Sequence, residues 1–493
     1  MTKRQASTAT TTKTTAKARR RASEVSAEPV VERVPRRKRS VRPTTREADF
    51  VVIGAGSGGV AAARRAASHG ARVILVERDA IGGTCVNRGC VPKKMLSYGA
   101  NWASILSTCL SHTGGKEDWR DASVRVNAEV ARLNASYTQR LNEAGVEILH
   151  GDARLSGADE VVVGNEIIRT RKTLIATGAH PLALPVPGGE LASSSDDVFT
   201  WQTVPASIAV IGGGYIAVEM ASILSRYGVK VDLLVRGDRL LPKFDHDIAA
   251  ALAEALAAKG VRLHFRADVT MLSQANGATE VCYTQQNNPG RTQTVRAQAV
   301  LAAIGRRPSI AELGLDALGV QLGERGGICV DRQFRTTVRS IHAIGDCMDR
   351  NLHLTPVAIA QGRWLADRLF GKRGDIADFD FVPTAVFSEP AIGAVGLTEA
   401  QAIEAAGGRA DRVRTEIKRF VSLENRFGGV AQPSVFKLVF NARSGRVLGA
   451  HLMDNAAPEI IQTFAVALRL GVKDAHLKTT MPLHPTVAEE LFG

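Results

Sequence analysis

The feature that most constrains the fold is a unit of strand, glycine-rich turn, helix and strand, which occurs twice in the chain. In the first unit, the turn GAGSGG at 54–59 follows a β-rich segment, and a second β-rich segment ends at Glu77. In the second unit, the turn GGGYIA at 212–217 lies between β-rich segments at 208–211 and 230–235. This pattern is typical of βαβ dinucleotide-binding folds. The sequence therefore predicts an α/β protein with two Rossmann-like domains.

The glycines of the two turns predict contacts with the pyrophosphate of a bound nucleotide. Glycine lets the backbone approach the phosphates, and the helix N-terminus that follows offers unpaired N–H groups and the positive end of its dipole. Glycines also form ordinary turns, so the prediction depends on the placement of each turn between a strand and a helix. The expected contacts are Gly54, Gly56, Ser57, Gly58 and Gly59 in the first turn and Gly212, Gly214, Tyr215 and Ile216 in the second.

The residue at the end of each second strand predicts which nucleotide the unit binds. Glu77 can accept hydrogen bonds from both ribose hydroxyls and would repel a 2′-phosphate, which suits FAD or NAD. Arg236 would instead attract a 2′-phosphate, with Arg239 and Lys243 nearby, which suits NADPH. The alternative for Arg236 is a solvated cation in a loop.

Two cysteines with four residues between them, Cys85 and Cys90, predict a redox site after the first unit. Five residues of regular helix advance about 7.5 Å, more than the roughly 7 Å between Cα atoms that a disulfide spans. The segment must therefore be distorted if the sulfurs bond, and Gly89 and the pre-proline residue Val91 make distortion inexpensive. Strained disulfides are easily reduced, which favours a catalytic role over two unpaired buried thiols. The other cysteines are expected to be small buried hydrophobic residues: Cys109, Cys282, Cys329 and Cys347.

The surroundings of the two cysteines favour the thiolate form. Arg88 lies between them, Lys93 follows them, and a helix N-terminus is predicted at the same place.

The formal net charge of +14 is concentrated in residues 1–46, which hold 14 Lys and Arg and 3 Glu, whereas the other residues hold 49 basic and 46 acidic side chains. The basic character therefore belongs to a tail and not to the predicted domains. Large apolar side chains are almost absent before Val25, so we expect residues 1–47 to be a disordered tail. The alternatives are an organelle transit peptide and, through 35–39, a tether to nucleic acid or an acidic surface.

The chain contains no stretch of about 18 consecutive apolar residues and no signal-peptide pattern, so we expect a soluble protein without membrane contact. Six cysteines in 493 residues are too few for a secreted disulfide scaffold. The sequence therefore favours the cytoplasm, or an organelle if the tail is a targeting signal. No metal site is expected.

Further motifs occur in order along the chain, and together they resemble the class I pyridine-nucleotide disulfide oxidoreductases, within them the glutathione reductases. Besides the two glycine turns, they are GGTCVNRGCVPKK at 82–94, LIATG at 174–178, AIGRRP at 303–308, IGD at 344–346, LTPVA at 354–358 and HPT at 484–486. The resemblance runs from about Asp49 to Glu490 and implies an enzyme that carries one FAD per subunit and uses NADPH as co-substrate.

The resemblance implies further cofactor contacts. Asp346 would bind the ribityl or pyrophosphate part of FAD, and Thr355 would begin a helix that points at the flavin; the alternatives are a strand-end cap and a plain N-cap. The other implied FAD contacts are Gly83, Thr84, Cys85, Lys93, Ala176, Thr177 and Gly178. The other implied NADPH contacts are Glu219, Gly305 and Arg306.

The resemblance also implies catalytic roles for residues outside the cysteine pair. Cys90 would face the flavin while Cys85 attacks the substrate, and Lys93 with Glu219 would form an ion pair beside flavin N5. Tyr215 resembles a gate over the flavin, although a tyrosine at a helix start often serves only packing.

His484 is the expected acid and base, oriented by Glu489. A competing interpretation is a capping box formed by Thr486 and Glu489. The resemblance implies that His484 acts on the disulfide of the other subunit, so that a homodimer is required.

The expected substrate is glutathione disulfide, because arginines stand where glutathione reductases bind its carboxylates. These are Arg64 and Arg363, with Tyr137 as a further substrate contact and Arg140 adding positive charge. The alternatives are a glutathione-amide, trypanothione or dihydrolipoamide type of disulfide. Two departures from the family pattern are Pro242, where many members have a second arginine for the 2′-phosphate, and the end of the chain at Gly493, where members continue.

The expected domains are an FAD domain at 48–178, an NADPH domain at 179–308, a segment at 309–380 that completes the FAD site, and an α+β dimerisation domain at 381–493. A different class of function, a flavin-containing binding protein tethered through the basic tail, is the competing hypothesis.

Overall fold

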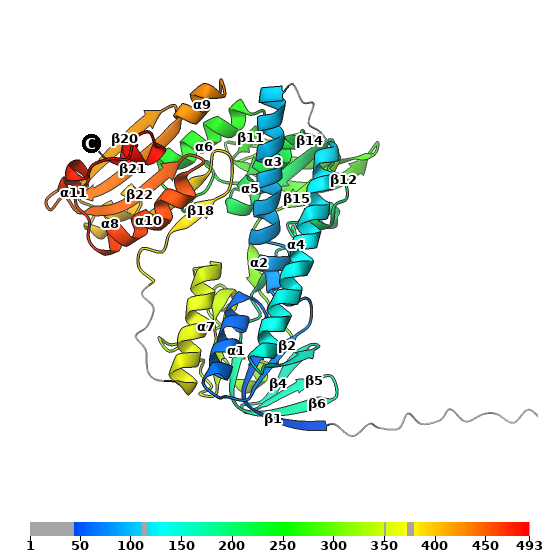
Figure 1. The fold of residues 1–493 in the computed structure, drawn as a ribbon. Helices are drawn as coiled ribbons and strands as arrows, with labels where there is room; N and C mark the ends of the chain where they lie inside the picture. Colours follow the sequence, from blue (N-terminus) through cyan, green and yellow to red (C-terminus); the bar gives the residue numbers. More distant parts are fainter. Residues whose placement is uncertain (1–43, 111–115, 350–351, 372–378, 493) are drawn as a thin grey trace, which may run out of the picture. The chain divides into compact units, whose positions relative to one another are not determined.

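The computed structural model describes residues 44–110, 116–349, 352–371 and 379–492 (Figure 1). The predicted tail lies outside the described residues up to position 43. Its last four predicted residues belong instead to strand β1 (Thr44–Ile53), where Arg46 pairs with Glu147 and Glu166. The prediction of a disordered tail is therefore wrong for residues 44–47, because pairing with the neighbouring strand β6 extends β1 beyond its apolar segment.

The first sheet has seven strands and contains the first predicted unit (Figure 1). β1 and β2 (Val73–Glu77) pair in parallel, and their apolar side chains are buried, as expected for a parallel sheet covered by helices. β17 (Ile341–Ala343) pairs with β6 (Glu166–Ile175), so the chain returns to this sheet after the second unit. The strand order is β3-β2-β1-β6-β5-β4, with β3 at Glu147–His150, β4 at Ala153–Gly157 and β5 at Glu160–Val163.

Helices α1 (Ser57–Ser68) and α7 (Thr355–Phe370) pack directly against each other beside this sheet (Figure 1). A Cβ atom on Gly362 would lie 2.4 Å from the carbonyl oxygen of Gly58, so a glycine is needed for this approach.

The second unit forms a five-stranded parallel sheet in the order β11-β10-β9-β15-β8. Helices α5 (Tyr215–Arg226) and α6 (His246–Ala258) belong to it, and an antiparallel three-stranded sheet packs against it through a shared apolar cluster. The strands of the parallel sheet are β8 (Ser193–Ser194), β9 (Ser207–Ile211), β10 (Lys230–Val235), β11 (Arg262–Phe265) and β15 (Ala299–Ala302). The antiparallel strands are β12 (Ala267–Ala275), β13 (Ala278–Gln285) and β14 (Asn288–Ala297), and a two-stranded ladder joins β7 (Ala179–Pro181) to β16 (Arg306–Pro308).

The C-terminal part forms an antiparallel sheet in the order β18-β19-β22-β21-β20. Helix α10 (Ala457–Arg469) packs closely on it, because a Cβ atom on Gly393 would lie 2.5 Å from the carbonyl oxygen of Ala457. The strands are β18 (Thr384–Val386), β19 (Ile392–Gly396), β20 (Val413–Phe420), β21 (Ser434–Asn441) and β22 (Val447–Met453). The other helices are α8 (Glu399–Ala405), α9 (Leu423–Phe427), α11 (Asp474–Thr479) and the 3-10 helix η6 (Val487–Leu491).

Helices α2 (Gly83–Asn87), α3 (Cys90–Leu110) and α4 (Lys116–Glu143) follow the first unit. α3 packs against α5 of the second unit, where the Tyr227 hydroxyl donates to the carbonyl oxygen of Leu96 (3.1 Å). The remaining 3-10 turns are η1 (Gly189–Leu191), η2 (Asp197–Thr200), η3 (Asp316–Leu318), η4 (Gly345–Cys347) and η5 (Ala410–Arg412). Among the described helices, none has the length and apolar character needed to cross a membrane.

Candidate active site

The helix breaks between the two predicted redox cysteines, within residues 82–94, which we call the redox loop. Cys85 lies in α2 and Cys90 begins α3, while Arg88 between them leaves the helical conformation with φ −151° and ψ 40°. A Cβ atom on Gly89 would lie 2.7 Å from the carbonyl oxygen of Thr84, so glycine permits this tight fold. The distortion that a Cys85–Cys90 disulfide requires is therefore present.

The two cysteines are free thiols in the structure, and a hydrogen bond between them makes them unequal. The pKa of Cys90 is lowered to about 6, chiefly by the hydrogen bond from Cys85. Burial raises this pKa, whereas the Thr355 hydroxyl and the Lys93 charge lower it further. The pKa of Cys85 is raised, first because its proton is held by Cys90 and then by burial. The thiolate of the pair is therefore Cys90, and Cys85 needs a base.

The surroundings of Cys90 include the first turn of α7. Its sulfur lies 3.7 Å from the Thr355 hydroxyl, and the N-cap of α7 is Leu354, so Thr355 is not the N-cap. The positive end of the α7 dipole also favours a thiolate here.

The other cysteines were predicted to be buried, and the structure agrees only in part. Cys347 is buried, whereas Cys282 and Cys329 are half-buried. The side chain of Cys109 lies outside the described residues.

Two carboxylates engage Arg88, which was predicted to favour the thiolate. It pairs with Asp79, and its Nε lies 3.9 Å from a carboxylate oxygen of Asp196. Asp196 also lies 3.5 Å from Arg306, which donates to the Thr84 hydroxyl at 3.4 Å. Asp196 thus links the redox loop to the AIGRRP segment, a contact between distant positions that nothing in the local sequence indicates.

Lys93 and Glu219 form a buried ion pair, with Nζ and Oε1 2.6 Å apart. Their side chains are 10 % and 3 % exposed. Lys93 comes from α3 and Glu219 from α5, so the pair joins the helix that carries Cys90 to the second dinucleotide unit. Both charges act on the pKa of Cys90, which Lys93 lowers and Glu219 raises.

The first glycine turn fits a nucleotide pyrophosphate. A Cβ atom on Gly54 would lie 2.5 Å from the carbonyl oxygen of Ala176, and one on Gly59 would lie 1.9 Å from the carbonyl oxygen of Gly54, whereas one on Gly56 would meet nothing within 4 Å. The turn is therefore closed toward the protein and open at the N-terminus of α1, where no side chain caps the helix. Gly83 of the redox loop packs on this turn, because a Cβ atom on Gly83 would lie 2.7 Å from the Cα atom of Gly56.

Several predicted FAD residues surround this opening. Glu77 accepts hydrogen bonds from the backbone N–H groups of Ala55 (2.6 Å) and Asp79 (2.9 Å) at the end of β2. The buried Thr177 hydroxyl has no partner among the described residues, and the Asp346 carboxylate forms no hydrogen bond with them. Burial raises the pKa of Asp346. Unpartnered polar groups beside an open helix N-terminus fit the phosphate, ribityl and ring edges of FAD.

The second glycine turn repeats the geometry of the first. A Cβ atom on Gly212 would lie 2.4 Å from the carbonyl oxygen of Ala303, whereas one on Gly214, the uncapped N-cap of α5, would meet nothing within 4 Å. Tyr215 begins α5 and is 45 % exposed. The helix continues through the half-buried Ile216.

The predicted 2′-phosphate residues follow β10. Arg236 and Lys243 are exposed and form no hydrogen bond or ion pair with the described residues. Arg239 donates instead to the carbonyl oxygen of Pro242 (3.0 Å). Gly305 lies in the left-handed region at φ 139°, at the turn before β16.

His484 is highly exposed, and its Nδ1 lies 2.9 Å from a carboxylate oxygen of Glu489. Thr486 does not cap η6 through its side chain, since its hydroxyl donates to the carbonyl oxygen of Leu483 (2.7 Å). The geometry thus agrees with the imidazole–carboxylate interpretation and not with the capping box. The structure does not bring His484 to Cys85 within the described part of one chain.

The predicted substrate residues lie on the helices around the redox loop. Arg64 on α1 and Arg363 on α7 are exposed and unpaired among the described residues, on two helices in direct contact. Tyr137 is half-buried on α4, whose Asn134 donates to Asn87 of the redox loop (3.0 Å). Arg140 is exposed one turn further along α4.

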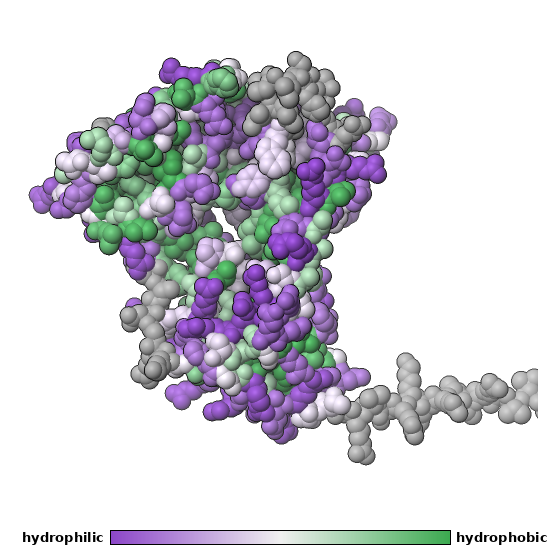
Figure 2. Space-filling view, in the orientation of Figure 1, coloured by the Kyte–Doolittle hydropathy of each residue, from purple (hydrophilic) through white to green (hydrophobic). Residues whose placement is uncertain are grey.

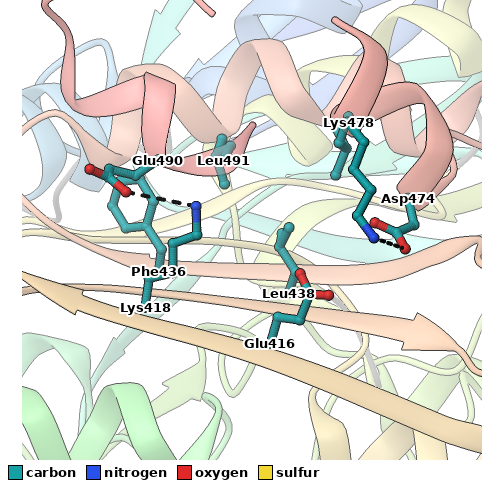
Figure 3. A pocket seen from close by; sticks show the side chains of 9 residues that line it. Glu416, Lys418, Phe436, Leu438, Asp474, Lys478, Glu490 and Leu491 are labelled. Carbon is teal, nitrogen blue, oxygen red and sulfur yellow. Dashed lines mark hydrogen bonds and ion pairs between the residues drawn. The ribbon is translucent and has the colours of Figure 1, made fainter. Parts of the chain in front are cut away.

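A cavity among the described residues lies elsewhere, under the C-terminal segment (Figure 3). It measures about 230 Å³ and contains the ion pairs Lys418–Glu490 (3.7 Å) and Lys478–Asp474 (3.0 Å). None of the predicted site residues lines it, so it is not the predicted active site.

Two family models match the chain. Residues 48–362 match pyridine nucleotide-disulphide oxidoreductase, and residues 382–492 match the pyridine nucleotide-disulphide oxidoreductase dimerisation domain. The chain belongs to the pyridine nucleotide-disulphide oxidoreductase family. The predicted resemblance and fold class are thereby confirmed.

Curated relatives cover nearly the whole chain. A glutathione reductase of Burkholderia cepacia is 40 % identical over 446 residues, which is 90 % of this chain and 97 % of that protein. Glutathione reductases of Nostoc sp. and Yarrowia lipolytica are each 36 % identical over 90 % of this chain and 98 % of their own lengths.

The C-terminal region of this chain, which matches the dimerisation-domain model, carries large apolar side chains on its surface. Figure 2 shows hydrophobic side chains over the elements of the C-terminal sheet. Leu470 is 83 % exposed, and Met481 and Leu483, which flank Pro482 just before His484, are 88 % and 74 % exposed. Met481 and Leu483 thus lie within three residues of His484, in the region that matches the dimerisation-domain model.

Proposed function

We propose that this protein is an FAD-containing enzyme that uses NADPH to reduce glutathione disulfide. The observation that carries the proposal is the redox loop, where two unequal thiols lie beside the Thr355 end of α7 and the buried Lys93–Glu219 pair. The relatives support the substrate, since all three are named glutathione reductase and match over nearly their full lengths.

The two glycine turns supply the nucleotide sites of the proposal. FAD would lie at the first turn, with Glu77 on its ribose and Thr177 and Asp346 along its chain. NADPH would lie at the second turn, with Arg236 on the 2′-phosphate. The bound flavin would supply the two electrons, taken from NADPH, that open the Cys85–Cys90 disulfide.

The reduced pair would then act on the substrate. Cys85 loses its proton to His484 of a second copy and attacks one sulfur of glutathione disulfide, forming a mixed disulfide. The departing glutathione thiolate takes the proton from His484. The Cys90 thiolate then attacks Cys85, which releases the second glutathione and restores the Cys85–Cys90 disulfide. Glu489 orients the imidazole for both proton transfers.

The substrate would lie across α1, α7 and α4. Its carboxylates would bind Arg64 and Arg363, which are exposed and unpaired among the described residues, and Tyr137 would contact its peptide part. Tyr215 would cover the flavin until the nicotinamide displaces it. Within this proposal, residues 48–178 bind FAD, 179–308 bind NADPH, 309–380 complete the FAD site, and 381–493 form the homodimer. We place the protein in the cytoplasm.

The proposal is tested by anaerobic titration of the purified yellow protein with NADPH, followed by a panel of disulfides. We expect Cys85→Ser to abolish turnover of glutathione disulfide while flavin binding and NADPH oxidation by artificial acceptors continue. A colourless protein, or full glutathione turnover in Cys85→Ser, would refute the proposal. Preference for trypanothione or a dihydrolipoamide-type disulfide would refute the substrate alone.

A further inference from the structure

Phe387 of the C-terminal domain contacts both members of the Lys93–Glu219 pair. It directly follows β18, and its backbone N–H donates to Glu219 Oε1 at 2.8 Å. The same carboxylate oxygen accepts from Lys93 Nζ at 2.6 Å. The carboxylate is therefore held from two sides, by α3 and by the C-terminal domain.

The ring of Phe387 contacts two neighbouring ammonium groups. Lys93 Nζ lies 4.6 Å and Lys94 Nζ lies 4.0 Å from the ring centroid, both within the range of a cation–π interaction. Burial and then the nearby charge of Lys93 lower the pKa of Lys94, so the two cations do repel each other. The ring gives both cations a favourable contact that offsets this repulsion and keeps Lys93 beside Glu219.

The next residues fix the position of Phe387 on α5. The Glu389 N–H donates to the Ser222 hydroxyl (2.9 Å), and the Glu389 carboxylate pairs with Arg226 (2.7 Å) and Lys259 (3.2 Å). Arg226 also donates to the Ser97 hydroxyl of α3 (3.3 Å). Contacts to Glu219, Ser222 and Arg226, one after another along α5, thus fix the position of residues 387–389 on this helix.

We propose that Phe387 is a positioning residue that holds the Lys93–Glu219 ion pair against Cys90. This role of Phe387 rests on the proposed function. The contacts of Phe387 with Lys93 and Glu219 do not depend on which disulfide is the substrate. Phe387 acts through Lys93, whose charge lowers the pKa of Cys90. Residues 382–492 would then contribute to the redox site of their own chain, in addition to pairing two copies.

The test is a pH titration of the Cys90 thiolate in the purified holoenzyme carrying Cys85→Ser, which keeps a hydroxyl donor but cannot form the disulfide. The thiolate is followed by its ultraviolet absorbance and by the long-wavelength absorbance that a thiolate produces beside an oxidised flavin. We expect Phe387→Leu to raise the pKa of Cys90 by about half a unit to one unit, which makes the thiolate-to-thiol ratio about threefold to tenfold smaller at a given pH. Phe387→Tyr keeps the ring and should leave the titration near its starting value.

The matched control is Phe440→Leu, which removes a second ring that contacts a cation in the same domain. Phe440 is buried, and the Arg414 guanidinium lies 4.0 Å from its ring centroid. It should cost stability without moving the Cys90 titration. An unchanged titration in Phe387→Leu, or an equal shift in Phe440→Leu or Phe387→Tyr, would overturn the inference. If the parent enzyme fails to reduce glutathione disulfide while Phe387→Leu still shifts Cys90, only the substrate proposal fails.

Discussion

Gly214→Ala should weaken NADPH binding and leave the fold intact. The backbone at Gly214 has φ −84° and ψ 178°, which alanine adopts without strain, and a Cβ atom there would meet no protein atom within 4 Å. The methyl group would instead occupy the open space at the N-terminus of α5, where the pyrophosphate of NADPH would bind.

The stability change should be small because its two parts oppose each other. Replacing an N-cap glycine with alanine costs about 0.5–1 kcal/mol. The smaller conformational freedom of alanine in the unfolded chain returns about 0.4–1 kcal/mol. The melting temperature should therefore change by less than about 4 °C. The Michaelis constant for NADPH should rise at least about tenfold, which corresponds to about 1.4 kcal/mol of lost binding.

Two further variants separate binding from folding. Gly56→Ala places a methyl group in the equivalent open space at α1, so it should lower flavin content and spare the second site. Gly212→Ala should destabilise the fold itself, because its Cβ atom would lie 2.4 Å from the Ala303 carbonyl oxygen at a φ of 140°. Flavin absorbance, thermal melts and NADPH kinetics measure the three effects. Unchanged NADPH kinetics in Gly214→Ala, or a melting point as low as that of Gly212→Ala, would refute the reasoning.

Arg236→Glu should raise the Michaelis constant for NADPH about tenfold to a hundredfold and that for NADH far less, because a charge-assisted bond to the 2′-phosphate is lost. Equal effects on both nucleotides would show that Arg236 does not contact that phosphate. Lys93→Met should raise the pKa of Cys90 above its value of about 6, so that less thiolate forms at neutral pH; a spectroscopic titration in which the pKa falls would contradict this electrostatic assignment. Glu489→Gln should lower steady-state glutathione turnover about tenfold or more, since the carboxylate that orients His484 is lost, while NADPH still reduces the flavin.

Local sequence patterns predicted the elements whose physical causes are also local. The two glycine turns lie where the strand and helix patterns placed them, and the break in the redox loop followed from the rise per residue of a helix. Only part of that break had the expected cause. It lies at Arg88 and Gly89, whereas Val91 is helical, because Pro92 falls in the first turn of α3, where proline is compatible with a helix.

Contacts between distant positions could not be predicted in the same way. The motif placed Arg88 between the sulfurs, but its charge is engaged by Asp79 and Asp196, which reach it only in the folded chain. Phe387 is 168 positions from Glu219 and carries no motif of its own. The choice between a His484 partner and a capping box for Glu489 also needed the fold, since both interpretations use the same Glu489 carboxylate.

The inequality of the two thiols connects these distant contacts to the chemistry. Because Cys90 takes the negative charge, Cys85 keeps a proton, and a nucleophile at Cys85 needs a base from outside the redox loop. The described chain offers its own Cys85 no histidine, whereas the exposed His484 pairs with Glu489 on the family's dimerisation domain. The region at 382–492 would then act on the cysteine pair twice, on Cys90 of its own chain through Phe387 and on Cys85 of a second copy through His484. The charge on one sulfur and the proton on the other would therefore both depend on the C-terminal domain.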